Sequence, residues 1–112
     1  MKEVKQLKIQ DYNTKSSRNP FRDWVKRLRD TKARSIIRDR IYRISNANFG
    51  DYKQLNFGVY EIRIHYGPGY RVYFGKDEDV VVILLCGGDK RSQKRDINKA
   101  KEYWNDYNQR KI

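Results

Sequence analysis

Cysteine and histidine are almost absent from this chain of 112 residues, which contains one of each. A single cysteine, Cys86, cannot form an internal disulfide, and a zinc site needs more Cys and His ligands than the chain offers. Long apolar runs are also missing, since the longest, Val80 to Cys86, is too short to cross a bilayer as a helix. No apolar stretch follows the charged residues 1–5, so no secretory signal is expected. We therefore expect a cytoplasmic protein without a metal site, a cofactor or a membrane span.

Acidic side chains are scarce relative to basic ones: 14 Asp and Glu stand against 26 Lys and Arg, a formal net charge of +12. Aromatic residues nevertheless make up 13% of the chain, which excludes a disordered basic tail, because such tails lack large apolar side chains. The length suits one ordinary domain and is too short for two. We expect a single folded domain over residues 1–112 that meets an anionic partner, with nucleic acid the first choice.

The positive charge is concentrated in the first half of the chain. Residues 1–50 hold 14 basic and 5 acidic side chains, whereas residues 51–112 hold 12 and 9. Two readings stay open for the N-terminal arginines: they steer the protein toward RNA, or they only solvate exposed helix faces. Arg34, Arg38, Arg40 and Arg43 are expected on the exposed side of the second helix. The residues expected to bind RNA are Arg27, Arg34 and Arg38, together with Arg91, Lys94 and Arg95 in the second half.

The first half predicts one strand and two helices. Residues 4–9 form a weak alternating pattern with lysines, which is typical of an edge strand. Asn19-Pro20 is a good helix start, because Asn caps a helix and Pro suits its first position. Thr31 is expected to cap a second helix, which residues 46–50 close. Two short amphipathic helices in this arrangement form an αα-hairpin.

The second half predicts three strands and a last helix. Residues 59–66 and 70–74 alternate between apolar and polar side chains, and residues 80–86 are continuously apolar, as in a strand buried on both faces. Gly87-Gly88 is expected to end that strand, and Ser92 to cap the last helix. The order β-α-α-β-β-β-α predicts an α+β domain with a mainly antiparallel sheet. We expect the helices on one sheet face, with the other face partly open.

The hairpin predicts a cluster of polar side chains on the face away from the core. A three-residue loop at 67–69 would place two arginines, a histidine and a tyrosine together, where an anion fits between the like charges. A different loop length would change these pairs. The predicted pairs are Tyr66 with Tyr70, Ile64 with Val72, Ile62 with Phe74, His65 with Arg71 and Arg63 with Tyr73.

Basic residues also follow the apolar strand and can approach the same cluster from its end. They are Lys90, Arg91, Lys94 and Arg95. The preceding glycine pair exposes backbone N–H groups, but its spacing matches no nucleotide-binding fingerprint. Trp24 and Trp104 are expected in the core, with stacking on a base as the alternative, and Cys86 is expected to be a small core residue.

Three segments carry a resemblance to a known family: Gly-Val-Tyr-Glu-Ile-Arg-Ile at 58–64, Gly-Tyr-Arg-Val-Tyr-Phe at 69–74, and Leu-Leu-Cys-Gly-Gly-Asp-Lys at 84–90, followed by Gln93 and Asp96-Ile97. They resemble the phage-derived branch of the RelE/HigB superfamily, the toxins of type II toxin–antitoxin modules. The resemblance implies two N-terminal helices packed on a curved, mainly antiparallel sheet, with a C-terminal helix.

For function, the resemblance implies a ribosome-dependent mRNA endonuclease that inhibits translation until a cognate antitoxin neutralises it. The antitoxin is expected to be a helix-turn-helix protein encoded nearby. Cleavage in this family uses no metal: the ribose 2′-OH attacks the adjacent phosphate. Such a reaction needs a base for the 2′ proton, cations for the developing phosphorane charge and an acid for the leaving oxygen.

The family's basic positions match residues of this chain. The match implies that Arg71 and Lys90 contact the phosphate and that Arg63 supports the base step. The family's C-terminal catalytic tyrosine, or His-Tyr pair, has no counterpart here. His65 is the candidate base, since the ordinary imidazole pKa of ~6.5 suits proton transfer near neutrality, and an ordinary surface histidine is the alternative. Tyr73 is its candidate companion.

Two other functions remain open. A ParE-like inhibitor of DNA gyrase would share the fold without the RNase residues, and the basic hairpin argues against it. A non-catalytic basic module would bind RNA through its positive charge but would not cleave it.

Overall fold

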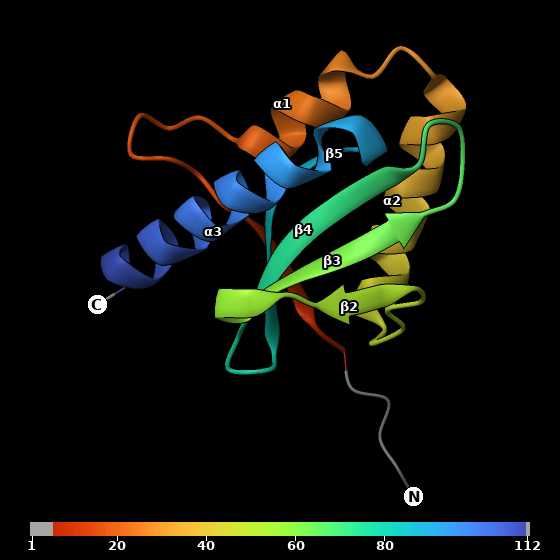
Figure 1. Ribbon diagram of the computed structural model, residues 1–112. Helices are drawn as coiled ribbons and strands as arrows, with labels where there is room; N and C mark the ends of the chain where they lie inside the picture. Colours follow the sequence, from red (N-terminus) through yellow and green to blue (C-terminus); the bar gives the residue numbers. More distant parts are fainter. Residues whose placement is uncertain (1–5, 112) are drawn as a thin grey trace, which may run out of the picture.

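The computed structural model of the chain describes residues 6–111, and its strands form a five-stranded sheet with helices on both faces (Figure 1). The elements in chain order are β1 (Lys8–Asp11), α1 (Pro20–Arg27), α2 (Thr31–Ser45), β2 (Tyr52–Gln54), the short 3-10 helix η1 (Asn56–Gly58), β3 (Val59–Ile64), β4 (Tyr70–Asp77), β5 (Val81–Asp89), the 3-10 helix η2 (Lys90–Ser92) and α3 (Gln93–Arg110). The predicted α+β class is confirmed.

The sheet has the strand order β1-β5-β4-β3-β2 and is mainly antiparallel, as predicted. Only the β1–β5 pair among these neighbours is parallel. The first strand was predicted at residues 4–9, but β1 begins at Lys8, and residues 4 and 5 lie outside the described residues. The short edge strand β2 was not predicted, because its three exposed residues are too few to show a pattern.

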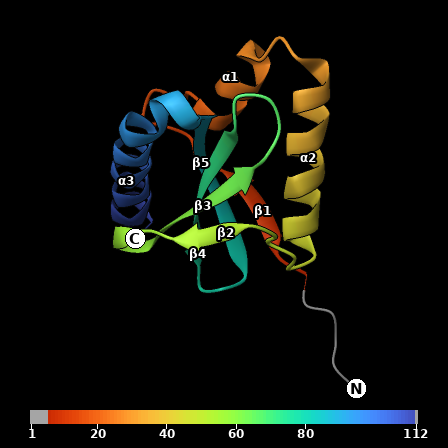
Figure 2. The same cartoon turned by 45° about the vertical axis from the view of Figure 1, so that its right-hand side comes forward.

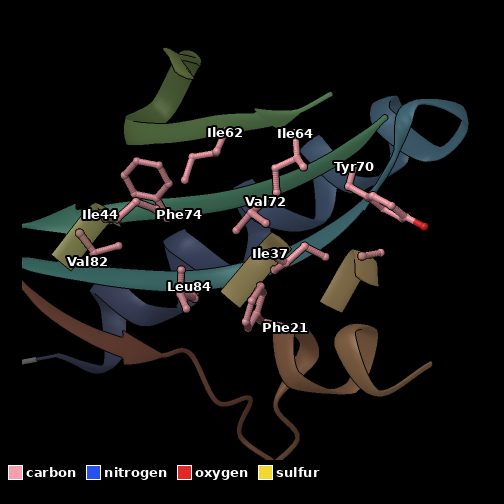
Figure 3. Packing of buried hydrophobic residues seen from close by; sticks show 11 residues of the cluster. Phe21, Ile37, Ile44, Ile62, Ile64, Tyr70, Val72, Phe74, Val82 and Leu84 are labelled. Carbon is pink, nitrogen blue, oxygen red and sulfur yellow. The ribbon is translucent and has the colours of Figure 1, made fainter. Parts of the chain in front are cut away.

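Helices α1 and α2 cover one face of the sheet (Figure 2). Alternate residues of β3, β4 and β5 point toward them, because successive strand side chains leave opposite faces. Asn19 caps α1 as predicted, and its side chain accepts the Arg22 N–H. Asp30, not Thr31, caps α2: its carboxylate accepts the N–H groups of Lys32 and Ala33. Figure 3 shows the buried cluster, which includes Phe21, Ile37, Ile44, Ile62, Ile64, Val72, Phe74 and Leu84.

Helix α3 lies on the opposite face, so the prediction of helices on one face only is wrong (Figure 2). The physical reason is a second apolar set on that face, formed by alternate strand residues such as Val59, Ile83 and Leu85. Ala100 of α3 is fully buried against this set. Strand β5 is consequently buried on both faces, as its continuous apolar run predicted.

Two tryptophans anchor the helices on glycines of the sheet. Trp24 of α1 lies against Gly87 and Trp104 of α3 lies against Gly75, so closely that a Cβ on either glycine would overlap the indole ring. Both tryptophans pack against the core clusters, as predicted. Gly87-Gly88 therefore does not end β5, which continues to Asp89, because the pair provides space for packing inside the strand.

Ser92 stands at the N-cap position of α3 as predicted, but its side chain makes no capping hydrogen bond there. Its hydroxyl donates to the Asp96 carboxylate instead. Across residues 6–111, no helix combines the length and apolar character that a membrane span requires.

Candidate functional site

The register of the β3–β4 hairpin places Arg63 directly opposite Arg71 and Glu61 opposite Tyr73. The predicted pairing is wrong by two positions, since the connection runs over residues 65–69 rather than 67–69. A shift of two positions leaves every side chain on its predicted face, because strand side chains alternate with a period of two. Both arginines therefore share the face that packs against α3. The observed core-side pairs are Tyr60 with Phe74, Ile62 with Val72 and Ile64 with Tyr70.

Tyr66 explains the longer connection. Its hydroxyl donates to the Asp30 carboxylate at the start of α2, over 2.9 Å. Tyr66 thus lies outside the strand ladder, where it was predicted to pair with Tyr70, and Ile64 takes its place opposite Tyr70. The turn then closes through the Gly69 N–H, which donates to the Tyr66 carbonyl. Gly69 has a φ of 82°, in the left-handed region that favours glycine.

A fully buried carboxylate, Glu61, lies between the two arginines. The Nε atom of Arg63 lies 3.6 Å from Glu61 Oε1, and the Nε atom of Arg71 lies 3.7 Å from Oε2. The Glu61 side chain has no exposed surface, whereas those of Arg63 and Arg71 are 35% and 13% exposed. The cluster of Glu61, Arg63 and Arg71 is thus open to solvent only through its two arginines.

Tyr73 and Gln93 hold the Glu61 carboxylate from two different elements. The Tyr73 hydroxyl donates to Oε2 over 3.0 Å, and the Gln93 Nε2 amide donates to the same oxygen over 2.9 Å. Burial, and then the nearby Glu61 charge, raise the pKa of Tyr73 far above its ordinary value, which keeps the hydroxyl a donor. Tyr73 is fully buried and lies opposite Glu61, so it is not the companion of His65 that the predicted register suggested.

His65 lies past the end of β3 and is not opposite Arg71. Its side chain is 74% exposed, and its Nε2 atom makes a hydrogen bond with the Asp51 carboxylate. That hydrogen bond is the main reason why the pKa of Asp51 is lowered. The Asp51 carbonyl also accepts the Arg63 N–H over 2.9 Å. The His65–Asp51 dyad is therefore attached to the strand at Arg63.

Arg40 fixes the same end of β3 from helix α2. Its two terminal nitrogens donate to the Arg63 carbonyl over 3.0 Å and to the Phe49 carbonyl over 3.2 Å. Arg40 was expected on the exposed side of its helix, but these contacts leave it partly buried. Burial is the main reason why the pKa of Arg40 is lowered.

Lys90 follows β5 at the start of η2 and lies next to the Arg71 side of the hairpin. A Cβ placed on Gly69 would lie 3.8 Å from the Lys90 Cβ and 3.7 Å from Arg71 Nη1. The same Nη1 atom donates to the Gly69 carbonyl over 3.2 Å. The structure thus brings Arg63, Arg71 and the backbone of Lys90 to one edge of the molecule.

A groove with a volume of about 1050 Å³ lies between α1 and the η2–α3 segment. We call it the basic groove, because its five basic side chains outnumber its three acidic ones, Asp89, Asp96 and Glu102. It brings together four of the six residues predicted to bind RNA: Arg27, Arg91, Lys94 and Arg95. Trp24 also lines the groove, together with Lys99, which the sequence did not single out. The other two predicted residues, Arg34 and Arg38, line a separate hollow of about 490 Å³ beside α2.

Sequence reasoning missed Glu61, Gln93 and Asp51. For Glu61 a signal was available: its position in the alternating segment places it on the same face as Arg63, two residues away. Gln93 belongs to the segments that carry the family resemblance, but no local pattern places it or Asp51 at the hairpin, because α3 and the segment before β2 reach the hairpin only through the tertiary fold.

Comparisons with known proteins identify the family. The family model described as "Phage derived protein Gp49-like (DUF891)" matches residues 23–105. An uncharacterized protein of Haemophilus influenzae (strain ATCC 51907 / DSM 11121 / KW20 / Rd) is 48% identical over 81 residues, which cover 72% of this chain and 82% of that protein.

The fold is similar to that of the E. coli toxin RelE, whose structure is known for a mutant in the free state. The TM-score is 0.55 at 16% sequence identity, and the match covers 96% of this chain and 99% of that chain. At this identity the likeness establishes the fold and no individual residue. The chain therefore belongs to the phage-derived Gp49-like family, in agreement with its sequence resemblance, and it has a fold like that of RelE.

Proposed function

We propose that this protein is the toxin of a type II toxin–antitoxin module and acts as an endoribonuclease on mRNA bound to the ribosome. The observation that carries the proposal is the Arg63–Arg71 pair, directly opposed on neighbouring strands and open to solvent. The Glu61 carboxylate offsets only one of the two guanidinium charges, so the pair still favours an anion, and a phosphodiester matches its donor geometry.

The proposed reaction is a transesterification. The ribose 2′ oxygen forms a bond to the adjacent phosphorus, and the bond from phosphorus to the 5′ oxygen breaks, which leaves a 2′,3′-cyclic phosphate and a 5′-OH end. Arg71 and Lys90 stabilise the negative charge that develops on the phosphorane. His65, oriented by Asp51, accepts the 2′ proton, and Arg63 supports this step, while the leaving 5′ oxygen takes a proton from water. Tyr73 does not contact the RNA, and it acts through its hydrogen bond to the buried Glu61 carboxylate.

The groove between α1 and α3 supports the same proposal. The RNA chain continues from the arginine pair past η2 into this groove. There Arg27, Arg91, Lys94 and Arg95 neutralise its backbone phosphates. Arg34 and Arg38 stand apart from this path, and we assign them to long-range steering toward RNA in the cytoplasm. The proposed antitoxin carries an acidic segment that covers the basic surface.

The test is expression without antitoxin, with growth and mRNA 5′ ends recorded for the wild type, Arg71→Ala and Lys90→Ala. The wild type is expected to arrest growth and to cut mRNA, with the cuts lost in both variants, because removing one charge-stabilising donor costs about 10²–10³-fold in rate. Arg43→Ala, which removes an exposed arginine paired with Asp39 on α2, is the matched control.

Other outcomes would assign another function. An SOS response with intact mRNA would identify a gyrase inhibitor of the ParE type. Arrest of translation with intact mRNA would identify a non-catalytic RNA-binding module.

A further inference from the structure

We propose that Glu61 is a positioning residue that sets both the geometry and the net charge of the Arg63–Arg71 pair, so that the pair accepts one phosphodiester. This inference rests on the proposed function and assigns a role to a residue that does not itself contact RNA. Glu61 has no exposed surface, so it reaches the substrate only through the arginines.

The first argument is charge. Like charges directly opposite each other on neighbouring strands are destabilising, and Arg63 and Arg71 stand in that relationship. The Glu61 carboxylate lies within 4 Å of the Nε atom of each arginine and offsets their repulsion. Two guanidinium groups and one carboxylate leave a net charge of one positive unit, which matches the single negative charge of a phosphodiester.

The second argument is direction. The carboxylate faces the Nε atom of each guanidinium, the nitrogen nearest the strand. Each guanidinium is a planar fork, and one terminal nitrogen of Arg71, Nη1, donates to the Gly69 carbonyl over 3.2 Å. Phosphate recognition by arginine uses this planar fork, so a carboxylate at Nε aligns the fork.

The third argument is how Glu61 itself is held. The two hydrogen bonds to Oε2 come from Tyr73 on β4 and Gln93 at the start of α3, and both donors are neutral. They fix the carboxylate without changing the charge of the cluster. They also couple the docking of α3 to the arrangement of the arginines.

Three buried atoms of the cluster have no hydrogen-bond partner among residues 6–111: Glu61 Oε1 and the Nε atoms of Arg63 and Arg71. The contacts between Glu61 and the arginines are therefore made by charge, at distances just beyond hydrogen bonding. A buried carboxylate is costly for a fold to keep, and an apolar side chain of similar volume is often at least as stable. A role in positioning explains why a carboxylate stands here.

The experiment compares the wild type with Glu61→Gln in a cleavage assay on ribosomes programmed with a defined mRNA. Removal of the carboxylate is expected to lower kcat about 10²-fold, because small misplacements of a reacting group have this effect. KM is expected to stay the same or fall, since the cluster becomes more positive. Glu78→Gln makes the same chemical change at an exposed turn and is expected to match the wild type.

A second measurement does not depend on activity. In the wild type, the NMR signals of the Arg63 and Arg71 Nε–H groups are expected to be shifted away from those of exposed arginines, and Glu61→Gln is expected to remove that shift. If the wild type cleaves no RNA, the proposed function fails, and this measurement still tests the role of Glu61. A folded Glu61→Gln protein with wild-type kcat and unchanged arginine signals would overturn the inference.

Two milder variants keep the test open if Glu61→Gln does not fold. Tyr73→Phe and Gln93→Leu each remove one donor to Oε2 and leave the carboxylate in place. Each is expected to lower kcat by less than Glu61→Gln and to change the arginine signals. Wild-type kcat and signals in both variants would contradict a positioning role for this network.

Discussion

The indole ring of Trp24 lies against Gly87 and fills the space that any side chain at that position would occupy. Trp104 has the same relationship with Gly75 on the other face of the sheet. Each contact joins one helix to one strand, and together they hold α1 and α3 on the two sides of β5 and β4. The basic groove depends on the first contact, because Trp24 and Gly87 both line it.

We therefore expect Gly87→Ala to lower the free energy of unfolding by about 1–3 kcal/mol, the typical cost of overpacking a tight interior contact. Urea denaturation followed by tryptophan fluorescence measures this change. Ser35→Ala, at an exposed position of α2, is the control and is expected to stay within about 0.5 kcal/mol of the wild type. Equal stability of Gly87→Ala and the control would show that α1 moves away at little cost.

Arg40 offers a second test, because its guanidinium joins the ends of two segments through the Arg63 and Phe49 carbonyls. We expect Arg40→Met to lower the free energy of unfolding by about 1–3 kcal/mol, since it leaves partly buried carbonyls without their donor. Chemical denaturation measures the loss. Arg43→Met removes an exposed arginine one turn away and serves as the control. An unchanged midpoint in Arg40→Met would mean that solvent replaces these hydrogen bonds fully.

The His65–Asp51 dyad gives a prediction about the proposed chemistry. His65→Gln is expected to lower the rate of RNA cleavage by about 10²–10⁴-fold, the usual contribution of general acid–base catalysis. Asp51→Asn is expected to have a smaller effect, because it removes only the partner that orients the ring. Both side chains are largely exposed, so the thermal stability of the fold should hardly change. Cleavage at the wild-type rate by His65→Gln would place the base elsewhere in the site.

Acid stability is expected to depend on Asp77. Hydrogen bonds from Lys111 and then from Tyr107 lower the pKa of Asp77 below its ordinary value of 3.8. A carboxyl group with a lowered folded-state pKa stabilises the fold above its unfolded pKa, and this contribution is lost as the pH falls through the folded value. The melting temperature should therefore fall as the pH drops below 3.8.

Asp77→Asn provides the comparison for that measurement. The variant is expected to be less stable than the wild type at neutral pH and to lose less stability on acidification, because its amide does not titrate. Melting curves recorded over the acid range measure both effects. Parallel decline of the two proteins with pH would assign the acid sensitivity to other carboxyl groups, such as Asp106 beside Tyr12.

Local patterns predicted the parts of the fold that depend on neighbouring residues. Asn19-Pro20 begins α1 as expected, because capping and the fixed φ of proline act within one turn. The apolar run from Val80 to Cys86 corresponds to β5, which begins at Val81 and is buried on both faces, whereas Val80 is exposed in the preceding turn. The prediction of Thr31 as the cap of α2 was wrong by one residue, because Asp30, directly before it, is an equally good capping residue.

The placement of α3 could not be predicted in the same way. An apolar stripe on a helix shows that one face is buried, but it does not show which sheet face covers it. The placement of α3 depends on Val59, Ile83 and Leu85, which come from strands β3 and β5 and together make the second sheet face apolar. The burial of Glu61 follows from that placement, because Gln93 at the start of α3 supplies one of its donors.

The sequence by itself determined that Arg63 and Arg71 share one face of the sheet, since the period of two along a strand survives any shift of the register by two residues. Only the tertiary structure decided that they stand directly opposite each other with Glu61 between them. The physical reason is that the connection makes contacts with distant parts of the chain, such as the hydrogen bond from the Tyr66 hydroxyl to the Asp30 carboxylate at the N-cap of α2. The alternation of side chains follows from the local backbone geometry of a strand, whereas the register of strand pairing depends on the tertiary contacts of the connecting loop.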